Sequence, residues 1–256
     1  MQMEIPIKDA EKNDHRDPGA NRYGNFINYY SFHSAEERVQ QLPRNVWRSS
    51  HPDRKFLGLD IGCNAGDLTL ALHDFLEPLL TEDGGADLSL LGVDFDPVLI
   101  ERACEKNYWP DHVTFKCLNF ISDDRDKLLR EYLCKHNRSH FDVAFCFSIS
   151  MWIHINYGDF GLVEFLSGVC KFSNMVVIEP QRWKCYRNAS RRLRRFNGED
   201  FPLLDSLKYR GNMSEHIQNI LKEYCNFQKV TVTGNNSWGR EILIYERNTN
   251  IPVDAQ

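Results

Sequence analysis

The chain alternates short apolar runs with amphipathic stretches, a pattern that predicts strands and helices in alternation. Runs that predict buried strands fall at residues 56–59, 88–94, 112–118, 141–147, 174–179, 228–233 and 241–246. Helical stretches begin at residue 68 and cover 98–106, 121–137, 158–171 and 213–225. This order predicts an α/β fold built on a doubly wound, mostly parallel sheet. The connector 234–240 is too short for a parallel crossover, so we expect one of the last two strands to run antiparallel.

The chain is expected to form one folded domain behind a flexible tail. Residues 1–20 are polar and predict the tail, whereas residues 21–250 are long enough to bury a sizeable core. Within the domain, residues 21–50 form an arm that is dense in aromatic side chains. In this arm Ser34 to Glu37 resemble a capping box, which predicts a short helix.

The composition indicates the redox environment and the cellular location of the protein. The 256 residues carry a net charge of −5, and the eight cysteines show no C-x-x-C spacing. This favours a reducing compartment, with neither a disulfide framework nor a metal site. We expect no signal peptide and no membrane segment, because the first residues are polar and apolar runs are short. The expected location is the cytoplasm, with the nucleus as a further possibility, and the expected state is a monomer.

The first predicted strand runs into a glycine-containing loop of the form D-x-G-x-x-x-G, from Asp60 through Gly62 to Gly66. The loop opens a helix, whose free N–H groups and positive dipole end favour a ligand. Its glycine spacing differs from the dinucleotide fingerprint, and no P-loop Gly-Lys-Ser/Thr follows. The loop instead resembles the S-adenosylmethionine site of class I methyltransferases. Asp94, at the end of the second strand, is placed to accept hydrogen bonds from ribose hydroxyls.

A basic stretch follows the fifth predicted strand. Between Glu179 and Glu199 the sequence contains no acid and these basic residues: Arg182, Lys184, Arg187, Arg191, Arg192, Arg194 and Arg195. At helical spacing Trp183, Tyr186, Ser190 and Leu193 share one face, and most of the cations lie on another. In an acidic protein this imbalance predicts a face that binds a polyanion, over a basic segment of about 181–212.

Taken together, the motifs resemble the bicoid-interacting-protein-3 family of S-adenosylmethionine-dependent RNA 5′-phosphate methyltransferases. The resemblance rests on 24–26 with Arg38, 59–67, 94–97, 151–156 with 158–159, 179–181 with Trp183, and 236–238. It implies a class I, Rossmann-like methyltransferase fold with a seven-stranded sheet. The segment 183–187 with its basic helix is similar to the branch that methylates 5′-monophosphates of histidine tRNA and precursor microRNAs. Arg182 stands where the motif usually has proline.

The resemblance implies roles for individual residues. S-adenosylmethionine, with S-adenosylhomocysteine as product, would be held by Asn25, Arg38, Asp60, Gly62, Cys63, Asn64, Gly66, Asp94, Phe95, Asn119, Phe120 and Phe147, of which Arg38 would reach the methionine carboxylate. The acceptor phosphate would be surrounded by Trp152, His154, Asn156, Lys184 and Arg187. The RNA backbone would follow Arg182, Arg191, Arg192, Arg194 and Arg195.

The chemistry of a 5′-monophosphate fits these roles. Its second pKa is near ~6, so at neutral pH its oxygen is already a nucleophile and needs no general base. Catalysis then reduces to alignment for in-line transfer, which can supply roughly 7–11 kcal/mol.

Other functions fit parts of the same pattern. The protein could cap an RNA 5′-triphosphate, or bind RNA on the same fold without turnover. A methyltransferase acting on a small molecule is disfavoured by the basic helix, because a neutral small substrate needs no such face, whereas a protein substrate stays open.

Overall fold

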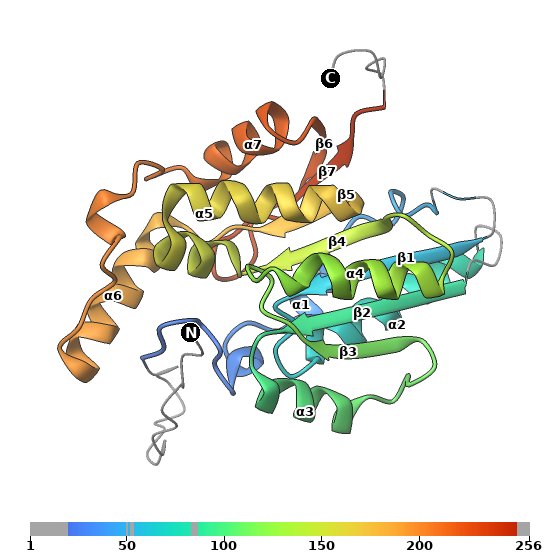
Figure 1. Cartoon of the computed structure of the whole chain (residues 1–256), viewed down its shortest axis with the longest axis horizontal. Coiled ribbons are helices and arrows are strands. Elements are labelled where there is room, and N and C mark those ends of the chain that lie inside the picture. The colour runs from blue at the N-terminus through green and yellow to red at the C-terminus, as the bar shows by residue number, and fades with distance from the viewer. Residues whose placement is uncertain (1–19, 50, 52–53, 83–86, 250–256) are drawn as a thin grey trace.

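The computed structural model describes residues 20–49, 51, 54–82 and 87–249 (Figure 1). Its sheet has seven strands in the order β3-β2-β1-β4-β5-β7-β6. The strands are β1 (Lys55–Ile61), β2 (Asp87–Asp94), β3 (Val113–Cys117), β4 (Phe141–Phe147), β5 (Ser173–Glu179), β6 (Phe227–Val232) and β7 (Leu243–Arg247). Only β7 runs antiparallel to its neighbours among the described pairings. The expected mostly parallel, doubly wound sheet is confirmed.

Helices cover both faces of the sheet. They are α1 (Ala35–Gln41), α2 (Asp67–Glu82), α3 (Pro97–Lys106), α4 (Asp124–Lys135), α5 (Ser150–Phe172), α6 (Trp183–Asn197) and α7 (Met213–Glu223), with 3-10 turns η1 (Tyr29–Ser31) and η2 (Leu204–Ser206). One core cluster joins the sheet to α1, α2 and α3, and the other joins it to α4, α5, α6 and α7. Because both faces are covered, the central strand β4 is buried at every residue.

The carboxyl ends of the parallel strands meet at one edge. In Figure 1 the arrowheads of β2, β4 and β5 point toward the side where the blue N-terminal arm and the orange α6 lie. Ligands of open α/β sheets bind beyond this edge. Residues from the arm, from three loops and from α6 are therefore brought to the place where the sequence motifs predict chemistry.

The segment after β4 corrects one expectation. The sequence predicts a loop over residues 148–159 before a helix at 158–171, but α5 already begins at Ser150. Ser148 has φ 55°, which turns the chain sharply out of β4. Gly158, with φ 74° and ψ −174°, separates the first two turns of α5 from the remainder. Because residues 150–157 are helical, the directions of their side chains are fixed by the helix, whereas a loop would have left them less constrained.

The predicted boundaries of other elements differ by small shifts. The third strand begins at Val113 instead of residue 112, and the seventh begins at Leu243 instead of residue 241. The capping box is present in part, because the Ser34 hydroxyl accepts a hydrogen bond from the Glu37 amide. The expected tail lies outside the described residues apart from residue 20. Among the described helices none is long and apolar enough to span a membrane.

A buried carboxylate fastens several of these elements together. Glu179, at the end of β5, is fully buried and forms ion pairs with Arg38 of α1 at 3.1 Å and with Arg240 at 3.7 Å. Ser148 donates to its Oε2 at 2.5 Å. Its Oε1 accepts from the side chains of two residues of the β6–β7 connector, Asn236 at 2.9 Å and Trp238 at 2.8 Å.

The pKa of Glu179 reflects this setting. Burial alone would raise it, but Arg38, Arg240 and the hydrogen bonds from Ser148 and Trp238 hold it below its ordinary value. The carboxylate is therefore charged, and it ties the arm, β4, β5 and the connector into one unit.

Gly158 should not tolerate a side chain. Its dihedral angles lie in a region that is essentially restricted to glycine, so Gly158→Ala should lower the free energy of unfolding by about 1–3 kcal/mol in a urea titration. Gly234→Ala is the matched control, since its Cβ would meet nothing within 4 Å and its φ is not in the left-handed region. Equal losses in the two variants would contradict the assigned break in α5.

Removing the charge of Glu179 should be far more damaging than removing a surface charge. Glu179→Gln leaves two buried guanidinium groups without their carboxylate, which should cost about 3–5 kcal/mol in urea unfolding. Glu131→Gln, at an exposed position of α4, should change stability by less than about 0.5 kcal/mol. A loss below about 1 kcal/mol for Glu179→Gln would show that the ion pairs do not fasten the fold.

Candidate active site

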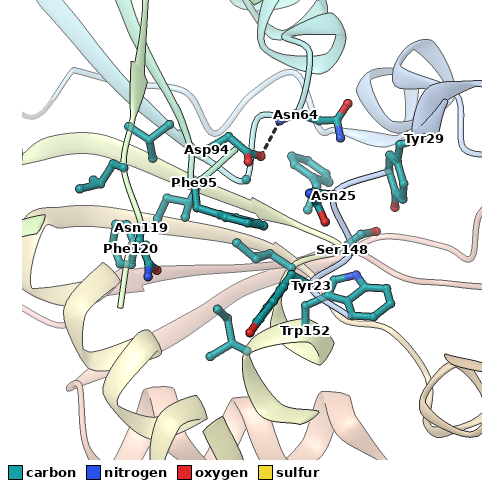
Figure 2. Close-up of a pocket in the computed structure, with 18 of the residues that line it drawn as sticks. Tyr23, Asn25, Tyr29, Asn64, Asp94, Phe95, Asn119, Phe120, Ser148 and Trp152 are labelled. Atoms are coloured by element: carbon teal, nitrogen blue, oxygen red, sulfur yellow. Dashed lines mark hydrogen bonds between the residues drawn. The ribbon is translucent and has the colours of Figure 1, made fainter. Parts of the chain in front are cut away.

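A pocket lies at the carboxyl edge of the sheet, between the arm and the ends of β1, β2 and β4. The empty space in it is about 670 Å³, a volume that includes open solvent at its mouth. Its lining residues are Tyr23, Gly24, Asn25, Tyr29, Tyr30, Ile61, Gly62, Asn64, Val93, Asp94, Phe95, Leu118, Asn119, Phe120, Phe147, Ser148, Ile149, Trp152 and Ile153. Figure 2 shows Asn119 and Phe120 on the side of this pocket opposite Tyr29.

The glycine loop forms one wall. Gly62 has φ 78°, and a Cβ there would lie 2.9 Å from Ile149, so glycine is required both by conformation and by space. The loop is anchored to β2 because the Gly62 amide donates to the Val93 carbonyl at 2.8 Å. Asn64, with φ 53°, donates its amide to Asp94 Oδ2 at 3.0 Å (Figure 2).

Asp94 has the position expected of a group that binds ribose. It is buried, and its Oδ1 accepts from the Asp96 amide at 3.0 Å. Each carboxylate oxygen thus has one backbone partner and retains acceptor capacity. Burial raises the pKa of Asp94 to about 6, against the lowering effect of these hydrogen bonds. The group is ionised at neutral pH and titrates just below it.

The aromatic arm closes the pocket from the other side. Gly24 lies so close to Trp152 that a Cβ would approach the indole ring to 2.3 Å. Asn25 donates to Asp96 Oδ2 at 2.6 Å, and the Asn64 side chain donates to the Phe26 carbonyl at 3.0 Å. The arm is therefore hydrogen-bonded to both the glycine loop and the β2–α3 turn, and it lines the pocket.

The structure brings several of the residues that the sequence assigned to the cofactor or the acceptor together around one pocket. The structure brings Asn25, Gly62, Asn64, Asp94, Phe95, Asn119, Phe120, Phe147 and Trp152 into its lining. It also adds residues that the sequence analysis did not select, chiefly Tyr23, Tyr29, Tyr30, Ser148 and Ile149. The density of aromatic residues in the arm was a usable signal for the three tyrosines. Ser148 and Ile149 carry no such signal, because their place depends on the turn after β4.

Other residues of the glycine loop lie behind the pocket. Asp60 is buried and accepts a hydrogen bond from Thr69 at 2.6 Å, while burial raises its pKa to about 6. Cys63 is fully buried, and a Cβ on Gly66 would meet Phe115 at 2.8 Å. These three were expected to touch the cofactor, but in the structure they shape the turn beneath it.

Arg38 departs from its expected role. It is fully buried and absent from the lining, and its Nε and Nη2 are both directed at Glu179. Nη2 also reaches the Tyr29 hydroxyl at 2.9 Å, and Nη1 donates to the His33 carbonyl. Because the guanidinium fork is occupied, it cannot grip a ligand carboxylate bidentately. Arg38 instead positions Tyr29, which does line the pocket.

Two residues expected around the phosphate are also engaged elsewhere. His154 is fully buried, with Nδ1 3.0 Å from the Tyr186 hydroxyl and Nε2 3.0 Å from Asp159 Oδ1. Burial lowers its pKa, although Asp159 opposes the shift. Asn156 donates to the Arg22 carbonyl at 2.9 Å and so holds the arm. Both correct the sequence-based expectation, because neither lines the pocket.

The basic helix has the amphipathic arrangement that its spacing predicts. Tyr186, Ser190 and Leu193 are buried in α6, while the cations Arg182, Lys184, Arg187, Arg191, Arg194 and Arg195 are exposed and Arg192 is half-buried. Arg194 pairs with Asp200 at 3.3 Å, and Arg182 donates to Asn235 at 2.9 Å. None of these cations lines the pocket itself. They form a positive surface on and before α6, which lies on the side to which the arrowheads of β2, β4 and β5 point (Figure 1).

The arrangement can hold a nucleoside-like ligand and place a polyanion next to it. Asp94 can accept from hydroxyls, the aromatic arm can cover an apolar moiety, and α6 supplies the opposite charge to phosphate. Within the described ranges no group of three or more His, Cys, Asp and Glu side chains is placed to hold a metal ion.

Comparison with curated proteins gives relatives along nearly the whole chain. The chain is 39% identical over 249 residues to a pre-miRNA 5′-monophosphate methyltransferase of Xenopus laevis, covering 94% of this chain and 98% of the relative. It is 42% identical over 238 residues to an RNA 5′-monophosphate methyltransferase of Bos taurus, covering 90% and 82%. A U6 snRNA methylphosphate capping enzyme, Amus, of Drosophila melanogaster is 27% identical over 181 residues, covering 65% and 55%.

Solved structures support the fold. The chain aligns with LepI in complex with SAM at a TM-score of 0.51 and 12% identity, over 82% of this chain and 48% of that one. The bifunctional kinase-methyltransferase WbdD aligns at a TM-score of 0.50 and 15% identity, over 93% and 45%. The chain thus spans about half the length of each, and at this identity the likeness concerns the fold alone.

The family profile described as Bicoid-interacting protein 3 (Bin3) matches residues 141–247, the part of the chain that contains the turn after β4, the basic helix and Glu179. With this match and relatives of about 40% identity along nearly its full length, the chain belongs to the Bicoid-interacting protein 3 family.

Proposed function

We propose that this chain transfers a methyl group from S-adenosylmethionine to the 5′-monophosphate of a small structured RNA, such as histidine tRNA or a precursor microRNA. The observation that carries the proposal is the juxtaposition of two features: a covered pocket with Asp94 at its wall, and the exposed cations of α6 beside it. Curated relatives with the name RNA 5′-monophosphate methyltransferase support the same reaction.

The residues of the pocket fit the cofactor. When bound, S-adenosylmethionine supplies an electrophilic methyl group on a sulfonium. Asp94 would accept from its ribose hydroxyls, because both carboxylate oxygens keep acceptor capacity and the side chain lines the pocket. Gly62 lets the backbone approach it closely, and Asn119 with Phe120 would flank the adenine.

The other side of the pocket is suited to an acceptor that needs no base. Ser148 and Trp152 line it there, and the nearest histidine of the motif, His154, has both ring nitrogens occupied. A phosphate dianion is nucleophilic as it stands, so positioning is what the site has to supply. Ser148 hydrogen-bonds to Glu179 and both arginines, which fixes its hydroxyl in place.

A 5′-triphosphate is the main competing acceptor. The Drosophila capping enzyme is similar to this chain, but at 27% identity, against about 40% for the monophosphate enzymes. The difference favours the monophosphate. A protein that binds RNA without turnover is disfavoured by the intact glycine loop and by Asp94.

We also propose that the protein acts as a monomer in the cytoplasm or the nucleus. All eight of its cysteines are free thiols, and three of them are buried as small apolar side chains. This usage suits a reducing compartment.

The acceptor can be identified with one RNA in three forms. A structured RNA carrying a 5′-monophosphate, a 5′-triphosphate or a 5′-hydroxyl is incubated with methyl-labelled S-adenosylmethionine. We expect label in the monophosphate form alone, since only that form presents a terminal monoester to the site. Preference for the triphosphate would assign the capping reaction instead. Cofactor binding with no label in any form would reject an RNA 5′-end as the acceptor.

Cofactor binding should weaken in mild acid. Asp94 has a pKa of about 6, so between pH 7.5 and 5 it gains a proton and loses acceptor capacity. The affinity for S-adenosylhomocysteine, measured by calorimetry, should fall about tenfold across this range. Asp94→Asn should bind more weakly at pH 7.5 and show a smaller pH dependence.

Asp67→Asn is the control for this experiment, since Asp67 is half-buried, pairs with Lys106 and does not line the pocket. Its binding and its pH profile should match the wild type. An Asp94→Asn profile that is as steep as the wild type's would assign the titration to a different group.

A further inference from the structure

A second cleft lies beyond β5, at the start of the basic helix. It encloses about 900 Å³, including open space, between three segments. Its lining comes from 180–184 at the β5–α6 junction, from 211–214 at the start of α7, and from Asn235, Arg240 and Glu241 of the β6–β7 connector. None of these residues lines the first pocket.

The cleft is rich in positive charge. Arg182, Lys184 and Arg240 line it, against a single lining carboxylate, Glu241. Lys184 lies in the first turn of α6, which contains no acidic residue and whose N-cap, Arg182, makes no side-chain capping bond. A cation at the positive end of a helix dipole is unfavourable by itself. Positive potential is therefore concentrated at the start of α6, where a bound anion would offset the repulsion between Lys184 and the helix dipole.

The buried cluster behind the cleft adds to this potential. Arg38 and Arg240 share one carboxylate, Glu179, so the three side chains carry an excess positive charge. The excess faces the cleft through Arg240, which lines it and is only 9% exposed. An uncompensated buried charge is costly, and a bound anion would offset that cost.

One hydrogen bond connects the lining of the cleft to the lining of the first pocket. Arg240 lines the cleft, and its Nη1 donates at 2.5 Å to the hydroxyl of Ser148, which lines the pocket. The linings of the two hollows are thus in direct contact. An RNA whose 5′-phosphate enters the pocket beside Ser148 would place its next phosphate near Arg240.

We propose that the second cleft binds the first internucleotide phosphodiester of the RNA through the exposed side chains of Lys184 and Arg182, with the buried charge of Arg240 behind them. The identity of the ligand, an RNA with a 5′-monophosphate, rests on the proposed function. The 5′-monophosphate occupies the first pocket and the following phosphodiester occupies the cleft. The enzyme therefore selects a phosphorylated chain end over a free nucleotide by reading two successive phosphates.

The test compares a mononucleotide with a dinucleotide. Guanosine 5′-monophosphate and the 5′-phosphorylated dinucleotide pGpG are offered as methyl acceptors, and kcat/KM is measured for each. In the wild type the dinucleotide should be better by at least about tenfold, as expected for a charge-assisted contact.

Ser214 provides a matched pair of variants. It lines the cleft near the start of α7, where a carboxylate suits the helix dipole. Ser214→Glu should repel the phosphodiester and reduce the dinucleotide advantage to about twofold or less, whereas Ser214→Gln, of equal size, should preserve it within about twofold. A fall of both acceptors by the same factor in Ser214→Glu would overturn the proposal, because the cleft would then hold the 5′-phosphate itself.

A binding measurement separates this proposal from the proposed function. The dissociation constant of a 5′-phosphorylated single-stranded 12-mer is measured against salt concentration. In a plot of the logarithm of the binding constant against the logarithm of the salt concentration, one lost phosphate contact should make the slope shallower by about 0.7. We expect this change in Ser214→Glu but not in Ser214→Gln. Equal slopes would overturn the cleft site whether or not methyl transfer occurs. Different slopes without transfer to any acceptor would keep the site and reject the reaction.

Discussion

The structure depends on a charged carboxylate buried at the end of β5. Glu179 is held by Arg38 and Arg240 and by hydrogen bonds from Ser148, Asn236 and Trp238. A buried ion pair gives little net stability relative to an apolar core, but it penalises any arrangement that leaves one partner alone. Its effect is thus to specify one position for the groups that it joins. Those groups come from the arm, from two central strands and from the last connector.

The pocket and the second cleft are both built against this cluster. On one side, Arg38 donates hydrogen bonds to Ser148 and Tyr29. Both of these residues line the covered pocket, as does Asp94. On the other side Arg240 faces the cationic cleft at the start of α6. An acceptor phosphate at their boundary would lie between Asp94, which we propose to bind the ribose, and cations that we propose to bind the RNA chain. For a nucleophile that needs no base, this division of labour supplies orientation, which is the main requirement.

The positive charge of α6 contrasts with the net negative charge of the whole chain. The chain has a net charge of −5, yet α6 carries six Lys and Arg residues and no acid. A local positive field attracts a polyanion even when the whole protein is acidic. The buried face of α6, with Tyr186, Ser190 and Leu193, keeps that field in a fixed place relative to the sheet edge.

The sequence by itself determined the fold class and the location of the site. Local periodicity identifies strands and helices, and a parallel sheet necessarily brings the ends of its strands to one edge. The glycine loop, Asp94 and the basic helix are therefore placed together by the order of the elements along the chain. Tertiary structure alone decided the roles of Arg38, His154 and Asn156, which sequence reasoning assigned to ligands. Arg38 meets Glu179 across 141 residues of sequence, and Asn156 meets Arg22 across 134. A polar side chain near a site either faces the ligand or supports another residue. Which of the two it does depends on the partners that packing brings from distant segments, and no local pattern encodes them.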